Sequence, residues 1–210
     1  GGHTDMTHGS SGWGDLSVTA LVRGWERGES RMHWNLGLSV PTGSVSETMG
    51  GHYLPYGMQL GSGTWDAKLG STFSHRFSDY SVGAQILGTI RLEDEGESGF
   101  ARSDALESSV WASWSPVRLW SLSGRIKYSA EGSLDGHYEG PHHHSAPPHF
   151  QRNYGGDVLE AGVGVTRLFG DGALRNHRLA VEFLTPVYQQ LNGVGMDRGP
   201  TLTAGWQYAW

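Results

Sequence analysis

The sequence predicts an all-β protein, a transmembrane antiparallel up-and-down β-barrel, and three observations support this prediction. Apolar and polar residues alternate with a period of two, aromatic residues stand near the ends of the alternating segments, and short and long connections follow each other in turn. Composition agrees, because 33 glycines and nine tryptophans accompany a hydrophobic fraction of only 37%. We expect residues 1–210 to form a single barrel domain.

The alternation defines about nine strands. It is clearest in the last strand, whose apolar row is Leu202, Ala204, Trp206, Tyr208 and Trp210. Comparable rows begin at Leu16, Met32, Trp65, Tyr80, Leu106, Trp120, Leu159 and Leu179. A soluble sandwich would alternate as well, but bulky aliphatic residues would fill its inner face, and aromatics would not bracket its apolar rows. The barrel is therefore the preferred interpretation.

The connections predict the direction of the strands. Residues 26–31, 78–79, 115–118 and 170–176 make short connections, residues 41–63, 93–102 and 131–156 make long ones, and residues 189–199 make an intermediate one. Barrels of the bacterial outer membrane place short turns in the periplasm and long loops outside, so the C-terminus is expected in the periplasm. Such barrels have even strand numbers, which predicts an odd number of further N-terminal strands and ten or twelve in all. A barrel sealed by another chain is the alternative.

Charged residues occupy the face opposite to the apolar rows, where they are expected to line the lumen. They are Asp15, Arg23, Asp66, Lys68, Arg76, Arg91, Glu107, Arg125, Lys127, Glu160, Arg178 and Glu182. The strand directions place several acids in the outer half and several arginines in the periplasmic half, which predicts a polarised lumen. Ion pairs that fill the interior would explain the same residues, and the sequence leaves both interpretations open.

The last strand also carries an assembly motif. Its Thr203, Gly205, Tyr208 and Trp210 resemble the C-terminal signal that the barrel-assembly machinery reads. An unpaired edge strand is hazardous in water, and in lipid it must pair to satisfy its backbone groups. The resemblance implies that this machinery and the lipid bilayer are partners of the chain.

Several segments resemble one family over nearly the whole chain. They are Gly14-Asp15-Leu16, Pro41-Thr42-Gly43, residues 55–66, and Pro186 followed by Leu191-Asn192-Gly193. This pattern is similar to outer-membrane transporters that are grouped with a phenol-degradation-pathway protein family. Members usually carry additional N-terminal strands, often after a segment rich in methionine and histidine, and this chain begins after them. The resemblance implies transport without specifying a substrate.

Histidines gather in the longest loop and suggest a metal site. His142, His143, His144 and His149 could bind copper, zinc or nickel through neutral imidazole, although a flexible proline-bearing loop provides no preorganised geometry. A second group of His3, Asp5, Met6 and His8 would favour copper. No cofactor is expected to be required. Because residues 131–156 contain few apolar side chains, we expect this loop to be dispensable for folding.

The remaining patterns exclude other functions. A nucleophile with a paired base is not recognisable, so catalysis is not expected. The net charge is −6 and the basic residues are scattered, which disfavours nucleic-acid binding. We therefore expect passive or facilitated passage of a small molecule through the outer membrane. The alternative is a non-catalytic structural, metal-binding or partner-binding barrel with a closed lumen. The permeant and the oligomeric state are not predicted.

Overall fold

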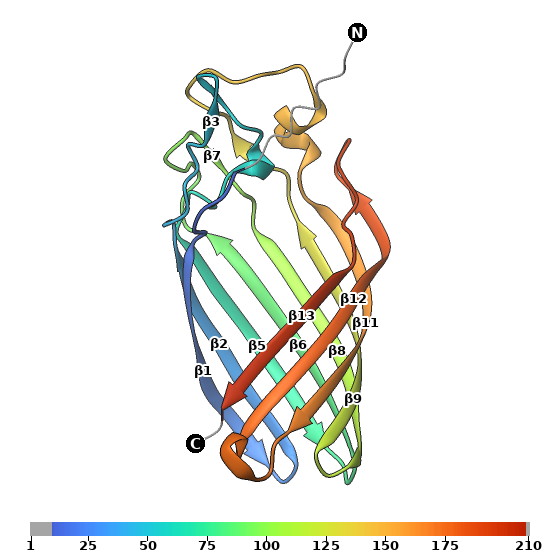
Figure 1. The fold of residues 1–210 in the computed structure, drawn as a ribbon. Helices are drawn as coiled ribbons and strands as arrows, with labels where there is room; N and C mark the ends of the chain where they lie inside the picture. Colours follow the sequence, from blue (N-terminus) through green and yellow to red (C-terminus); the bar gives the residue numbers. More distant parts are fainter. Residues whose placement is uncertain (1–9, 209–210) are drawn as a thin grey trace.

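The computed structural model describes residues 10–208, in which a nine-stranded antiparallel sheet curls around a long axis (Figure 1). Each strand pairs with its neighbour in the sequence, so the topology is up-and-down and the predicted fold class is confirmed. No helix within this range is long and apolar enough to cross a bilayer. The strands are β1 (Leu16–Arg27), β2 (Ser30–Val40), β5 (Asp66–Arg76), β6 (Tyr80–Arg91), β8 (Ala105–Val117), β9 (Trp120–Glu131), β11 (Gly156–Leu168), β12 (His177–Leu191) and β13 (Thr201–Tyr208).

The sheet is open between its first and last strands. Strands β1 and β13 are the two edges of the strand order, and every residue of both is exposed. An edge strand leaves backbone N–H and C=O groups without ladder partners, which a hydrocarbon environment does not tolerate. Closure in a membrane therefore requires further pairing along both edges. The prediction that additional strands supply this pairing stays a prediction.

The two faces of the sheet have opposite character. Directly opposed residues share a face, as Leu36 and Leu69 do on one side and Asn35 and Gly70 on the other. On the first face large apolar side chains are exposed, with Leu36 at 46% and Val163 at 66%, whereas on the second face Asn35 is only 5% exposed. The concave side of the curled sheet is thus polar and its convex side is apolar. This is the arrangement expected when lipid surrounds the wall.

Tight turns close one end of the sheet. Gly28 lies between β1 and β2 with a φ of 58°, a left-handed conformation that glycine adopts without steric cost. Near the same end the guanidinium of Arg167 lies 5.1 Å from the ring of Trp120 and 4.9 Å from that of Phe169. An arginine among aromatic rings is typical of a membrane–water interface. The turn end therefore has the side chains of an interface.

The other end carries a folded cap, which we define as residues 41–65, 92–104 and 132–155 (Figure 1). Its regular elements are short: β3 (Thr48–Met49) pairs with β4 (His52–Tyr53), and β7 (Phe100–Ala101) pairs with β10 (Asp135–Gly136). Three single turns complete it: η1 (Tyr56–Met58), η2 (Pro147–His149) and η3 (Gln151–Asn153). A fourth, η4 (Gly172–Leu174), lies in the connection between β11 and β12 at the turn end. The cap thus joins three connections that are far apart in the sequence.

The cap contains the hydrophobic core of the molecule. Val45, Tyr56, Phe100, Leu134 and Tyr138 are buried together, with Tyr53 and Tyr154 packed against them. The ring of Tyr138 stacks between two others, at 4.4 Å from the centroid of Tyr53 and 4.3 Å from that of Tyr56. The expectation that residues 131–156 have little to bury is therefore wrong. The loop inserts Leu134 and Tyr138 into this core, where stacked tyrosines pack beside the aliphatic side chains.

Candidate functional site

The ladder places almost all of the predicted lumen residues on the polar, concave face. Asp66 is directly opposite Arg91, and Lys127 is opposite Glu160. Arg178 is opposite Gln207 and lies on the same face of β12 as Glu182. The others on this face are Arg23, Lys68, Arg76, Glu107, Arg125 and Glu182. The period of two was sufficient for this placement because the register is regular along most of each strand.

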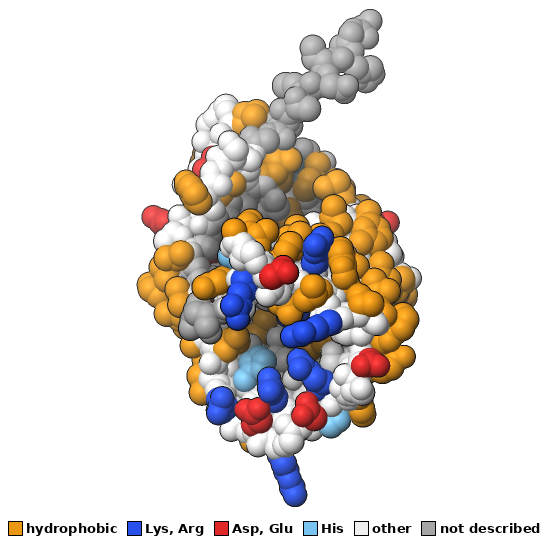
Figure 2. Space-filling model, turned by 60° about the horizontal axis from the view of Figure 1, so that its bottom comes forward, with side chains coloured by type: hydrophobic (Ala, Val, Ile, Leu, Met, Phe, Trp, Pro, Cys, Tyr) orange, Lys and Arg blue, Asp and Glu red, His pale blue; other side chains and the backbone are white. Residues whose placement is uncertain are grey.

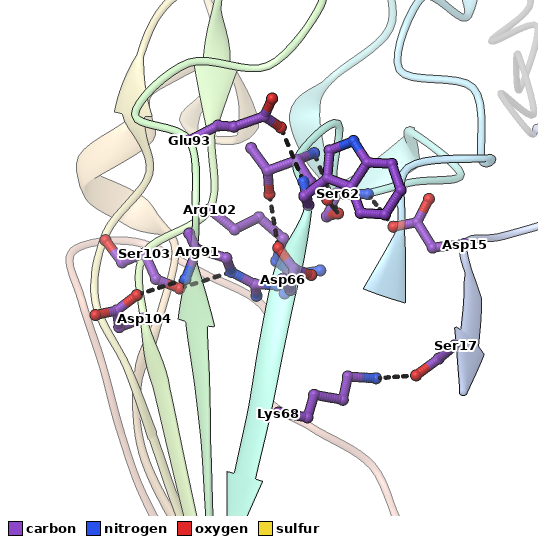
Figure 3. A network of polar contacts seen from close by, with 12 residues as sticks. Asp15, Ser17, Ser62, Asp66, Lys68, Arg91, Glu93, Arg102, Ser103 and Asp104 are labelled. Carbon is purple, nitrogen blue, oxygen red and sulfur yellow. Dashed lines mark hydrogen bonds and ion pairs between the residues drawn. The ribbon is translucent and has the colours of Figure 1, made fainter. Parts of the chain in front are cut away.

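Asp15 lies elsewhere. It precedes β1, and its carboxylate accepts hydrogen bonds from the backbone N–H of Gly43 at 2.9 Å and of Ser62 at 2.7 Å (Figure 3). The ladder between β1 and β2 ends at Leu16, whose backbone N–H donates a hydrogen bond to the hydroxyl of Thr42. Asp15 is therefore not on the concave face, because the strand begins one residue later, and its hydrogen bonds connect two parts of the cap to the start of the wall.

A chain of buried charges runs along the rim between wall and cap (Figure 3). The hydroxyl of Thr64 donates to Asp66 Oδ1 at 2.8 Å, and Arg91 Nη1 lies 2.5 Å from Asp66 Oδ2. Arg91 Nη2 is 3.7 Å from Glu131, which also receives Arg102 Nε at 2.9 Å. The side chains of Asp66, Arg91 and Glu131 are at most 15% exposed. Each charge therefore has an opposite charge close to it, as burial requires.

The rim chain also holds the loops in place. The backbone N–H of Arg91 donates to Asp104 Oδ1 at 2.8 Å, and that of Trp65 donates to Glu93 Oε2 at 2.9 Å. The sequence-based prediction did not include Glu131 or Arg102. Glu131 falls on the same row of β9 as Lys127, so the alternation alone identifies it, whereas Arg102 reaches the site from a loop and has no such pattern.

A second group of charges lies deeper along the concave face. Lys127 Nζ is 2.7 Å from Glu107 Oε1 and 4.0 Å from Glu160 Oε2. Glu160 is buried at 6% exposure. Lysine therefore bridges two carboxylates from neighbouring strands, and the group retains one unit of negative charge.

Toward the turn end the balance reverses. Arg125 Nε lies 2.9 Å from Glu182 Oε1, although its N–H does not reach hydrogen-bond geometry toward that oxygen, and the guanidinium lies 5.6 Å from the ring centroid of Trp111. Arg76 and Arg178 make no ion pair within residues 10–208. Figure 2 views this end and shows basic side chains gathered around a hollow. Positive charge is thus in excess at the turn end of the concave face, whereas the acids nearer the cap are paired with basic side chains.

The face is also hollowed near the turn end. A cavity of about 290 Å³ is lined by Trp111, Arg125, Arg178 and Glu182 with serine and threonine hydroxyls around them. Its lining comes from six strands of the wall, β6 to β13, and nearly all of it lies on the polar face. A smaller cavity of about 180 Å³ lies at the rim, between Tyr56, Arg102, Glu131 and Leu134.

The loop histidines form ring contacts and no assembled ligand set. His52 stacks on His143 at 4.5 Å between centroids, His142 approaches His144 at 4.3 Å, and His143 approaches His149 at 5.7 Å. Within residues 10–208 no group of three or more histidine or acidic side chains is placed to hold a metal ion. Burial, followed by His143, His144 and His142, lowers the pKa of His149. The other predicted metal group, His3, Asp5, Met6 and His8, lies outside the described residues.

The assembly motif is partly visible. Thr203 and Gly205 lie on the polar face of β13, and Tyr208 is opposite His177 at its end. Trp206 Nε1 donates to His177 Nδ1 at 2.7 Å on the apolar face. Trp210 lies outside the described residues. Recognition by the assembly machinery stays a prediction.

Comparison with solved structures supports the fold. The structure is similar to a solved outer membrane channel from Pseudomonas putida F1, with a TM-score of 0.62 at 14% sequence identity. The likeness covers 91% of this chain, which spans only 63% of the length of that one. No family model matches the chain, and neither does any curated protein sequence. The likeness supports the fold, and the grouping with a phenol-degradation-pathway family stays a prediction.

Proposed function

We propose that the protein is a non-catalytic channel of the bacterial outer membrane, through which a small molecule passes passively or by facilitated diffusion. The distribution of side chains on the wall supports this proposal. Its concave face is polar, charged and hollowed, and its convex face is apolar. A barrel that only filled its interior would balance its charges throughout, whereas Arg76 and Arg178 have no ion-pair partner in the described part of the chain. The channel of similar fold supports the same function.

The proposed orientation follows from the two ends of the sheet. Turns of a few residues join β1 to β2 and β5 to β6, whereas the cap joins the strands at the other end. We infer that the cap faces outward and that the turns and the end of β13 lie in the periplasm, as in outer-membrane barrels generally. Strands beyond those described would close the gap between β1 and β13.

Permeation through such a channel requires no chemical step. A solute would enter past the rim chain of Asp66, Arg91 and Glu131, pass Lys127 with its two carboxylates, and reach the positive region near the turns. The fixed charges are therefore nearly balanced near the rim and become positive near the turns. Fixed charges act strongly on an ion that passes through a narrow channel, because the surrounding protein and lipid have a low dielectric constant.

Planar bilayers test this proposal directly. The full-length protein, refolded from detergent into a bilayer in 1 M KCl, should produce discrete current steps, and protein denatured by heat should produce none. Liposome swelling in a neutral sugar is an independent measurement. Absence of both signals from a heat-modifiable, folded barrel would contradict the proposal and favour a closed lumen.

One observation favours a second function, a binding barrel whose outer loops hold metal. The stacking of His52 on His143 brings histidines of two loops together, and His142, His144 and His149 lie near them in sequence or in space. Calorimetric titration with copper or zinc should then show binding that is lost when His142, His143, His144 and His149 are replaced by alanine. Binding of equal strength to the variant would remove this alternative.

A further inference from the structure

We propose that the cavity near the turn end is a binding site for a small organic carboxylate. The cavity lies on the concave face of β6, β8, β9, β11, β12 and β13 and is lined by Trp111, Arg125, Arg178 and Glu182. The inference deepens the proposed function, because a site on the wall of a channel selects what the channel carries. The binding site itself needs only the cavity.

The charge of the cavity favours an anion. Two guanidinium groups, those of Arg125 and Arg178, face one carboxylate, that of Glu182. Arg125 is paired with Glu182 at 2.9 Å, which leaves the charge of Arg178 without a counter-charge in the described residues. The next charges along the face, Lys127 with Glu107 and Glu160, add a single negative charge on the far side, toward the cap. One ligand carboxylate would neutralise the cavity.

The donors of the cavity favour an oxygen anion with two acceptors. Arg178 presents a planar fork of N–H groups, which matches the two oxygens of a carboxylate better than it matches a spherical ion. Arg125 lines the same cavity with its guanidinium beside Glu182, and its Nε is shielded from solvent. Hydroxyls of Ser113, Ser123 and Thr203 complete a polar lining.

The size and the remaining surface limit the organic part. A volume of about 290 Å³ is at or below the lower end of the range for drug-sized ligands, so the ligand is small. The ring of Trp111, already beside the Arg125 guanidinium, and the Cβ of Ala180 provide apolar contact. A short acid with a few carbon atoms combines one charge with such an apolar tail.

Calorimetric titration of the full-length, detergent-folded protein with butyrate tests the site, and butyramide serves as the uncharged probe of the same shape. Butyrate should bind and butyramide should not. R178Q should weaken the binding of butyrate by about tenfold or more, because a charge-assisted pair is lost. R178K should fall between R178Q and the wild type, since it keeps the charge and loses the fork. R118Q removes a charge in the exposed β8–β9 turn and should bind butyrate as the wild type does.

Bilayer recordings of the same proteins separate this inference from the proposed function. Current steps together with equal binding of butyrate and butyramide, or with equal affinity of R178Q and wild type, would overturn the site and leave the channel intact. Absence of current together with butyrate binding that R178Q weakens would support the site and contradict the channel. If R178Q fails to give a heat-modifiable folded band, the comparison of butyrate with butyramide on the wild type decides the inference.

Discussion

The wall of the sheet and the cap at its loop end bury opposite kinds of side chain. In the wall, Asn35, Thr72 and Glu160 are buried while Leu36 and Val163 are exposed. In the cap, Tyr56, Phe100 and Tyr138 are buried in the manner of an ordinary soluble domain. The wall therefore buries polar side chains and the cap buries apolar ones. The charged rim of Asp66, Arg91 and Glu131 lies between the two regions.

The difference follows from the solvent that each region meets. Lipid surrounds the convex face of the proposed barrel, so apolar side chains there lose nothing by exposure, and the polar groups must find partners inside. In the proposed orientation the cap faces water, so it gains stability by removing aromatic surface from water. Hydrogen bonds such as Asn35 Nδ2 to Thr72 Oγ1 at 3.0 Å and Gln85 Nε2 to Thr72 Oγ1 at 2.9 Å hold the polar interior together.

The largest expected effect tests whether the cap is an independent core. Replacing Tyr138 with alanine removes the central ring of the stack, together with the hydrogen bond that its hydroxyl donates to Leu54 O. The cap should lose about 3–5 kcal/mol of local stability, because a large cavity is left in a packed core. Trypsin cleavage at Arg152 in reconstituted vesicles should accelerate, while heat-modifiability of the wall stays unchanged. Trp13→Ala is the control, because Trp13 is 91% exposed and its replacement should leave the cleavage rate unchanged. Loss of the folded band in Y138A would show that wall and cap fold as one unit.

The second prediction concerns the two faces of the wall. Val163 on the convex face and Ser123 on the concave face lie on adjacent strands, one exposed to the proposed lipid and the other lining the cavity. Val163→Arg should destabilise the folded barrel by about 2–4 kcal/mol, the cost of an arginine at the bilayer midplane. Ser123→Arg should cost less, since its side chain reaches water. Urea titration in vesicles measures both. Equal costs would mean that the faces are assigned wrongly.

The third prediction concerns the boundary between wall and cap. Asp66→Asn keeps the shape of the side chain but removes the charge that faces Arg91 at 2.5 Å and accepts the hydroxyl of Thr64. We expect a loss of about 1–3 kcal/mol, because the more distant Glu131 is then the one carboxylate left to Arg91 among the described residues, beside the carbonyl of Ser103. Hydrogen exchange should increase at residues 92–104 and in the adjoining ends of β5 and β6. Asp94→Asn, an exposed neighbour, should leave exchange unchanged. Equal exchange in both variants would show that the rim chain stabilises nothing.

The smallest expected effect is a pH dependence confined to the cap. The lowered pKa of His149 means that the folded cap prefers neutral imidazole, whose Nδ1 accepts the N–H of Ala146 at 3.2 Å. As pH falls through about 6.5, the unfolded loop binds the proton first, so the cap loses stability and the wall does not. Cleavage at Arg152 should increase by less than about tenfold between pH 7.5 and pH 5.5. The dependence should be weaker in His149→Gln. A steeper change in the wall than in the cap would contradict this explanation.

The wall could be predicted from the sequence because its evidence is local. Rows such as the one through Val163 repeat every second residue, and each of the nine predicted rows corresponds to a strand of the sheet. The error at Asp15 shows the limit of this reasoning, since alternation carries no information about the residue at which a strand ends. Arg102 shows another limit, because a loop residue that reaches a strand-borne carboxylate leaves no periodic pattern.

The sequence by itself therefore determined the strands, their order and their two faces. Only the tertiary structure showed that Tyr56, Phe100 and Tyr138, from three separate connections, pack into one core, and that Arg125 and Arg178 share a cavity. The physical reason is the range of the interactions. A period of two is set by the geometry of a single strand, whereas the cap and the cavity depend on contacts between residues that are tens of positions apart, which no local pattern encodes.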